Sequence, residues 1–157
     1  MSFNNPPIKI KEIQIYCNCH ATEDLEKVEQ AILNIIPEDI RGKVETRITK
    51  TQGHAGNSII LIELKINHNK LINSALNYLI KKISDIDKEY LYQVKDNHLD
   101  KNNCFYIRFD KQAAFNDILN LDNGDNTIRL MIKFILYKRE INKIFNSLEN
   151  IGLIKKA

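Results

Sequence analysis

Hydrophobic and polar residues alternate along five short segments of the chain, and this period of two predicts five β-strands. In the first segment, residues 8–19, the apolar face changes phase near Lys11 and Glu12, so we expect a β-bulge there. In the second segment, residues 43–50, the regular alternation predicts a half-buried strand. The remaining predicted strands cover residues 58–67, 105–109 and 128–136.

Apolar residues recur at intervals of three and four in other segments, and this spacing predicts helices. The first predicted helix begins after Thr22, which we expect to be its N-cap, and stops before Pro37. A broad apolar stripe predicts a second helix over residues 68–83, and a weaker one follows over 85–94. The last predicted helix ends at Gly152, because glycine readily adopts the left-handed conformation that ends many helices.

The predicted elements follow one another in the order β-α-β-β-α(-α)-β-β-α. Clean alternation in the strands is typical of a sheet with one face against a core and the other face in solvent. We therefore predict an α+β fold, a two-layer sandwich with a mostly antiparallel sheet and helices on one face. Residues 1–157 are expected to form a single domain, with residues 1–7 as a flexible tail.

The composition agrees with a globular protein, since 43% of the 157 residues are hydrophobic and 27% are charged. No apolar run is long enough to span a membrane, and the N-terminus does not resemble a signal peptide. Three irregularly spaced cysteines do not form a disulfide framework, so we expect a cytoplasmic protein. The net charge is only +3, but the cations gather in residues 41–50 and 129–143 and the acids in 23–29 and 85–100.

Few residues indicate catalysis or metal binding. The segment 17–20 contains two cysteines and a histidine, but a strand places the thiols and His20 on opposite faces. Buried cysteines acting as small hydrophobic residues are the favoured interpretation, and we expect neither a metal nor a cofactor. The chain has no P-loop, dinucleotide fingerprint or nucleophile elbow, so we expect no enzyme. A cleft that gathered His54, Asp110 and Cys104 would favour one.

A glycine-containing loop follows the second predicted strand. Its glycines, Gly53 and Gly56, allow a phosphate to approach the backbone N–H groups closely. The preceding strand carries Arg47 and Lys50, which could bind the same phosphate. A long hairpin loop with ordinary turn glycines explains the motif equally well.

Positive charge also gathers on the last two predicted strands. Arg129 and Lys133 share the outward face of one strand, and Tyr106 and Arg108 share that of the other. If the two strands pair, the open face combines an aromatic ring with several cations, which suits contacts to a nucleic-acid backbone and base stacking. A solvated face in a lysine-rich protein is the alternative.

Three motifs together resemble a known family. They are the "HATED" segment within residues 19–28, the "GHxGN" loop within 51–57, and the segment 106–114 with the sequence YIRFDKQAA. Their order and spacing, from about residue 8 to 150, are similar to those of archaeal RNA-binding proteins described as predicted exosome subunits. Ser58 stands where that family tends to have proline.

The resemblance implies a fold like that of ribosomal protein L5 and a non-catalytic role in RNA processing or turnover. RNA and exosome subunits would be the partners, and no membrane is involved. Asp110 belongs to the same motif, and buried turn-forming roles are the alternative for Asp110 and Gln112; a solvated salt bridge or a helix cap is a further alternative for Asp110. A protein-interaction adaptor with little RNA contact is the alternative function. The expected RNA-binding residues are Arg47, Lys50, Gly53, His54, Gly56, Asn57, Arg108, Lys111, Gln112, Arg129 and Lys133.

Overall fold

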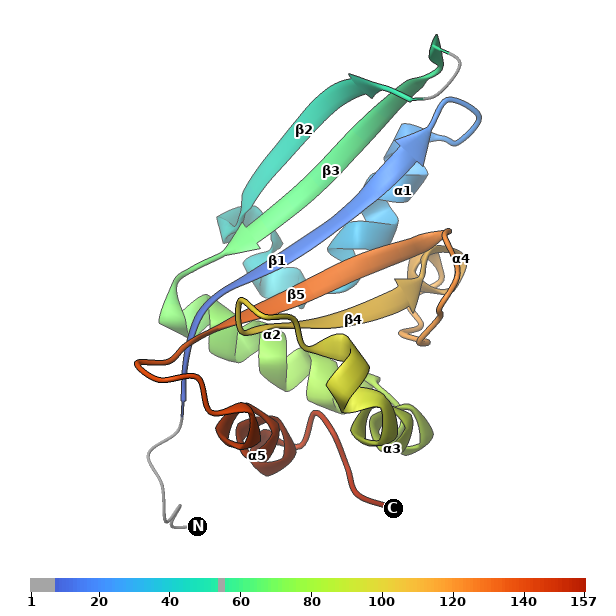
Figure 1. Cartoon of the computed structure of the whole chain (residues 1–157). Helices are drawn as coiled ribbons and strands as arrows, with labels where there is room; N and C mark the ends of the chain where they lie inside the picture. The colour runs from blue at the N-terminus through green and yellow to red at the C-terminus, as the bar shows by residue number, and fades with distance from the viewer. Residues whose placement is uncertain (1–7, 54–55) are drawn as a thin grey trace.

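The computed structural model describes residues 8–53 and 56–157 (Figure 1). The predicted tail 1–7 and His54 therefore lie outside the described residues. The strands are β1 (Lys9–His20), β2 (Glu45–Gln52), β3 (Ser58–Ile66), β4 (Cys104–Asp110) and β5 (Thr127–Ile135). The α-helices are α1 (Leu25–Leu33), α2 (Asn69–Lys82), α3 (Asp85–Val94), α4 (Lys111–Phe115) and α5 (Ile141–Ile151), with short 3₁₀ helices η1 (Glu38–Lys43) and η3 (Lys95–His98).

The five strands form one antiparallel sheet in the order β2-β3-β1-β5-β4. Figure 1 shows α1 and α2 behind the sheet, with the opposite face of the sheet turned to the viewer. The predicted α+β class, with an open antiparallel sheet and helices, is confirmed. The predicted bulge is also confirmed, since the register between β1 and β5 shifts between Ile10 and Glu12.

The hydrophobic core lies between the sheet and the helices. It consists of one phase of each of four strands, β1, β3, β4 and β5, together with the apolar stripes of the helices. Within β4, for example, Phe105, Ile107 and Phe109 are fully buried. Burial of such side chains contributes about 1.5–3 kcal/mol each. Burial of the apolar phase of the strands is therefore a main source of the stability of the fold.

The helix ends are set by local hydrogen bonds. The predicted cap of the first helix was wrong by two residues, because the carboxylate of Asp24, rather than Thr22, accepts the N–H of Glu26. Asp24 stands where the backbone is still extended, which is the geometry that N-capping requires. The predicted end of the last helix is confirmed, with Gly152 in the left-handed region at φ +92°.

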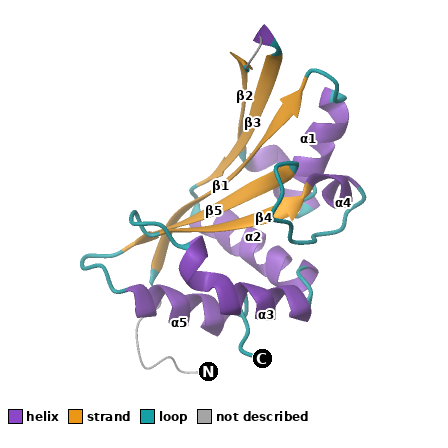
Figure 2. Cartoon of the chain, turned by 45° about the vertical axis from the view of Figure 1, so that its right-hand side comes forward, coloured by secondary structure: helices purple, strands orange, loops and turns teal. Residues whose placement is uncertain are grey.

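The second strand differs from its prediction. All eight residues of β2 are exposed, and Ile48 keeps 49% of its surface accessible. Figures 1 and 2 show the reason: the β2–β3 hairpin extends beyond the helices, so the inner phase of β2 has no layer to pack against. Alternation therefore predicted the strand correctly but not its burial.

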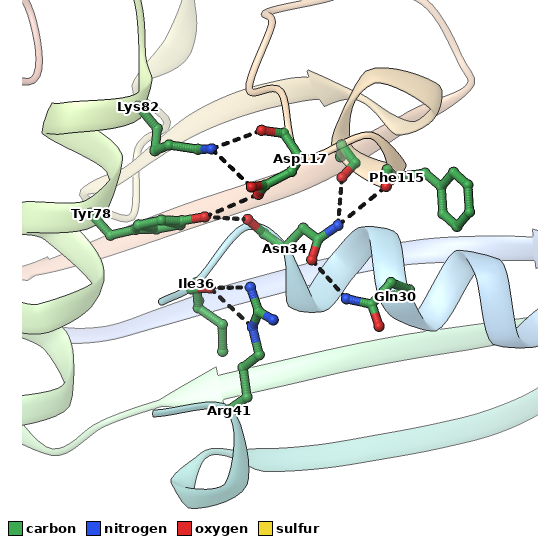
Figure 3. A network of polar contacts seen from close by, with 9 residues as sticks. Gln30, Asn34, Ile36, Arg41, Tyr78, Lys82, Phe115 and Asp117 are labelled. Atoms are coloured by element: carbon green, nitrogen blue, oxygen red, sulfur yellow. Dashed lines mark hydrogen bonds and ion pairs between the residues drawn. The ribbon is translucent and has the colours of Figure 1, made fainter. Parts of the chain in front are cut away.

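The short helix α4 was not predicted, and a polar network holds it in place (Figure 3). The Asn34 side chain, at the end of α1, donates hydrogen bonds to the carbonyl oxygens of Ala114 (2.9 Å) and Phe115 (3.4 Å). From α2, Lys82 Nζ lies 2.7 Å from the carbonyl oxygen of Asp117 and 3.3 Å from its carboxylate. These bonds fix the segment that follows β4 against two helices.

Candidate nucleic-acid interface

One row of side chains crosses the open face of the sheet. The strand registers place Arg47 opposite Glu63, Glu63 opposite Tyr16, Tyr16 opposite Arg129, and Arg129 opposite Arg108. The predicted pairing of the last two strands is thereby confirmed, and it brings Arg108 and Arg129 side by side. We call Tyr16, Tyr106, Arg108 and Arg129 the arginine–tyrosine cluster.

The two arginines of this cluster are not neutralised within the described part of the chain. Like charges directly opposite each other on paired strands destabilise a sheet. No acidic residue among those described forms an ion pair with Arg108 or Arg129. Arg129 is exposed and Arg108 half-buried, so both guanidinium groups can reach an anion. A bound phosphate would relieve their repulsion and accept their hydrogen bonds.

Tyr106 is held by a neighbouring loop. Its hydroxyl donates a 3.0 Å hydrogen bond to Asp100 Oδ2, while Asp100 Oδ1 accepts the N–H groups of Asn102 and Cys104. Burial would raise the pKa of Asp100, but these hydrogen bonds lower it below its ordinary value. Burial and the adjacent Asp100 raise the pKa of Tyr106 to about 12. Tyr106 is therefore a neutral ring in a fixed orientation.

A surface hollow lies directly between the members of the cluster. It has a volume of about 300 Å³ and is lined by Tyr16, Tyr106, Arg108 and Arg129. A second hollow, of about 410 Å³, continues along β1 and β5 and shares Tyr16, Tyr106 and Arg129. Met131 lines this second hollow. It shares the outward phase of β5, as predicted, but it is only 8% exposed.

Lys111, an expected RNA-binding residue, is buried and paired within the protein. Its side chain is 7% exposed, and Nζ lies 2.7 Å from the carbonyl oxygen of Asn18 and 3.2 Å from Glu23 Oε1. Burial alone would raise the pKa of Glu23, but hydrogen bonds from His20 N–H and Lys111 lower it. Lys111 lines the second hollow, but its ammonium group is already paired and joins the start of α4 to β1.

The glycine loop uses backbone groups for its own turn. Gly53 N–H donates to the carbonyl oxygen of Asn57 at 2.7 Å, and Gly56 N–H donates to that of Gly53 at 3.3 Å. Gly56 has a φ of +76°, which explains the need for glycine there. The N–H groups of both glycines are thus engaged within the hairpin turn.

The other predicted site residues are dispersed. Arg47 shares the phase of the open face but faces Glu63, whereas Lys50 lies in the opposite phase of β2. Lys133 is half-buried, opposite Cys104 and Glu12. Gln112 is exposed on α4, beside a separate hollow of about 230 Å³. Asp110 is the N-cap of α4 and accepts the Ala113 N–H at 2.8 Å, so the helix-cap interpretation is confirmed.

Tyr16 was missing from the predicted site. Its outward phase could be read from the buried positions Ile15 and Cys17 on either side. The pattern does not say, however, that β1 is the central strand and lies next to β5. That neighbour alone places Tyr16 beside Arg129.

The described residues hold no group of three metal-ligating side chains. Cys17 and Cys19 are buried on the core face, and burial raises the pKa of Cys17 to about 12. Such a thiol is a poor nucleophile and a poor metal ligand. Within the part of the chain that the structure covers, no helix is long and apolar enough to cross a membrane.

Comparisons with known proteins identify the family of this chain. A family model described as RNA binding matches residues 12–134. An RNA-binding protein of Pyrococcus abyssi is 35% identical over 127 residues, which cover 80% of this chain and 82% of that protein. An uncharacterized protein of Methanocaldococcus jannaschii is 34% identical over 130 residues, 82% of this chain and 87% of that protein.

Solved structures show the same fold. A crystal structure from Archaeoglobus fulgidus superimposes with a TM-score of 0.80 at 24% identity and covers 91% of this chain and 99% of that one. A crystal structure from Sulfolobus solfataricus has a TM-score of 0.72 at 26% identity, covering 89% and 96%. The matched family model spans β1 to β5, which includes all four members of the arginine–tyrosine cluster. The chain therefore belongs to the RNA-binding family.

Proposed function

We propose that this protein is a non-catalytic RNA-binding protein whose site is the open face of β1, β5 and β4. The observation that carries this proposal is the pair Arg108 and Arg129, which face each other without a described acidic partner. Arginine binds phosphate oxygens through two parallel hydrogen bonds, so the pair suits the RNA backbone. Membership in the RNA-binding family supports the same function.

The proposed cellular role is RNA processing or turnover in the cytoplasm, in association with the exosome. It is supported by the resemblance of the three motifs to predicted exosome subunits, which also supports a likeness to ribosomal protein L5. The proposal that the protein is not an enzyme is supported by the state of two residues that were considered as catalytic candidates, Cys104 and Asp110. Burial raises the pKa of the Cys104 thiol, and the Asp110 carboxylate caps α4.

Fluorescence anisotropy with a labelled RNA stem-loop carrying a single-stranded tail tests the site. We expect the double variant Arg108→Ala/Arg129→Ala to lose about a hundredfold or more in affinity, because each charge-assisted hydrogen bond contributes about 1.5–3 kcal/mol and tenfold corresponds to about 1.4 kcal/mol. The slope of log affinity against log salt should also decrease by about one unit for each lost phosphate contact. The matched control is Lys70→Ala/Lys81→Ala, which removes two exposed cations from α2. Equal affinities of the two double variants would contradict the proposed site.

Co-purification from native cells tests the cellular role. A tagged chain should retain exosome subunits, and ribonuclease treatment should show whether RNA bridges them. Recovery of RNA without any exosome subunit would contradict the association and leave the RNA site standing.

A protein-interaction adaptor is the second candidate function. It is favoured by β2, a fully exposed strand at the edge of the sheet. One backbone edge of such a strand is open to a strand of a partner. Under this alternative, Ile48→Lys would abolish protein co-purification after ribonuclease treatment, whereas Arg108→Ala/Arg129→Ala would not.

A further inference from the structure

Two tyrosines accompany the arginine pair on the open face. Tyr16 comes from the central strand β1 and Tyr106 from the edge strand β4, and both line the same hollow as Arg108 and Arg129. Both rings are half-buried, so part of each remains accessible. The arginines alone account for phosphate binding. The two tyrosine rings therefore suggest a second kind of contact at the same hollow.

The ring of Tyr106 is pre-oriented for stacking with a planar group such as a base. Its hydroxyl is bonded to Asp100, which is itself held by two backbone N–H groups. The ring therefore loses little further freedom when something stacks on it. Next to it, the buried Met131 lies opposite Tyr106 and Gln14 in the strand registers and lines the second hollow.

The spacing of the two strand positions that carry the tyrosines indicates the form of RNA. Tyr16 and Tyr106 lie on strands separated by β5 and are offset by two residues, so their α carbons are about 12 Å apart by strand geometry. Stacked bases in a duplex follow one another at only about 3.4 Å. The bases of a duplex are also enclosed, and its deep major groove does not admit side chains. Strand positions this far apart suit the bases of a strand that is unstacked.

We infer that the arginine–tyrosine cluster binds single-stranded RNA, with bases stacked on Tyr16 and Tyr106 and a phosphate between them on Arg108 and Arg129. This inference rests on the proposed RNA-binding role of the same face and names the form of RNA that it takes. Every base can stack on a tyrosine ring. The site is therefore expected to distinguish single-stranded from double-stranded RNA and to discriminate little between base sequences.

Fluorescence anisotropy with labelled oligouridine, free or paired with oligoadenine, tests the inference. The free strand should bind more tightly than the duplex. Tyr16→Leu and Tyr106→Leu should each weaken binding of the free strand about tenfold and leave duplex binding unchanged. Tyr16→Phe keeps the ring and should bind the free strand like the wild type, whereas Tyr106→Phe also loses the bond to Asp100 and should weaken binding, but less than Tyr106→Leu does. The control is Tyr90→Leu on α3, which should have no effect.

The outcomes separate this inference from the proposed function. Loss of binding in Arg108→Ala/Arg129→Ala, with full binding in both Tyr→Leu variants, would overturn the stacking role and keep the RNA site. Duplex binding as tight as that of the free strand would overturn the preference for single strands. Full binding in the arginine variant and in both leucine variants would overturn the site as well. Unchanged duplex binding shows that a leucine variant is folded, and Tyr16→Ser or Tyr106→Ser replaces a leucine variant that is not.

Discussion

The sheet ends in two edge strands, β2 and β4, that have the same alternating pattern and very different surroundings. In β4 the inner phase is fully buried, as in Phe105, and the strand is continued by a helix that is fixed to two others. In β2 the inner residue Ile48 is half exposed. The outward arginines differ as well, since Arg108 faces another arginine and Arg47 faces Glu63.

This difference shows that an alternating pattern specifies a strand but not what lies on either side of it. Burial of the inner phase depends on whether the helical layer extends beneath the strand, and it ends short of the β2–β3 hairpin tip (Figure 2). The charge of the outer phase depends on the neighbouring strand. Glu63 interrupts the row of cations, so positive charge is concentrated on the β4 side of the open face.

The largest expected difference between the edge strands is in stability. Phe105→Ala should lower the free energy of unfolding by about 3–5 kcal/mol, because it leaves a cavity in the core. Ile48→Ala should cost only about 0.5 kcal/mol, since the side chain is already largely in solvent. Urea denaturation measures both. Similar costs for the two variants would mean that β2 is packed against something in solution.

The Lys111–Glu23 pair tests how the end of β4 is anchored. Lys111→Ala should cost about 2–3 kcal/mol, somewhat less than a fully enclosed pair, because Glu23 is a quarter exposed. The lowered pKa of Glu23 means that its stabilising contribution is present above the pKa of an unfolded glutamate and is lost as the pH falls through the folded value. Stability of the wild type should therefore fall more steeply on acidification than that of the variant. Parallel pH profiles from thermal melts would contradict this pairing.

Single arginine variants compare the two sides of the open face in RNA binding. Arg108→Ala should weaken binding to oligouridine about tenfold, the loss of one charge-assisted contact. Arg47→Ala should have a much smaller effect, because Glu63 already faces Arg47 and would repel a phosphate. Anisotropy titrations at two salt concentrations measure both. A larger loss for Arg47→Ala would move the site to the hairpin.

The smallest effect is expected at Asp110, which sits at the junction of β4 and α4. Asp110→Ala removes a helix cap and should lower stability by about 1 kcal/mol, whereas Asp110→Asn should keep most of it. RNA affinity should be unchanged in both variants. A loss of RNA affinity without a loss of stability would indicate that Asp110 contacts RNA directly.

Much of the fold could be predicted from the local pattern of apolar and polar residues. The same pattern predicted which residues of β4 and β5 point to the open face of the sheet. The prediction that Tyr106, Arg108, Arg129 and Lys133 share one face needed only alternation and the pairing of two strands. Lys111 could not be placed in this way. Its partner Glu23 is 88 residues away along the chain, and no spacing rule connects the two.

The sequence by itself determined the strands, most of the helices, their polar and apolar faces and the family motifs, because backbone period and capping act within a few residues. Only the tertiary structure decided that β1 is central, that Tyr16 stands beside Arg129, and that β2 has no helix beneath its inner face. Burial and the pairing of charges arise between segments far apart in the chain. Their outcome is therefore a property of the assembled layers, and the proposed binding face of this protein is formed by that assembly.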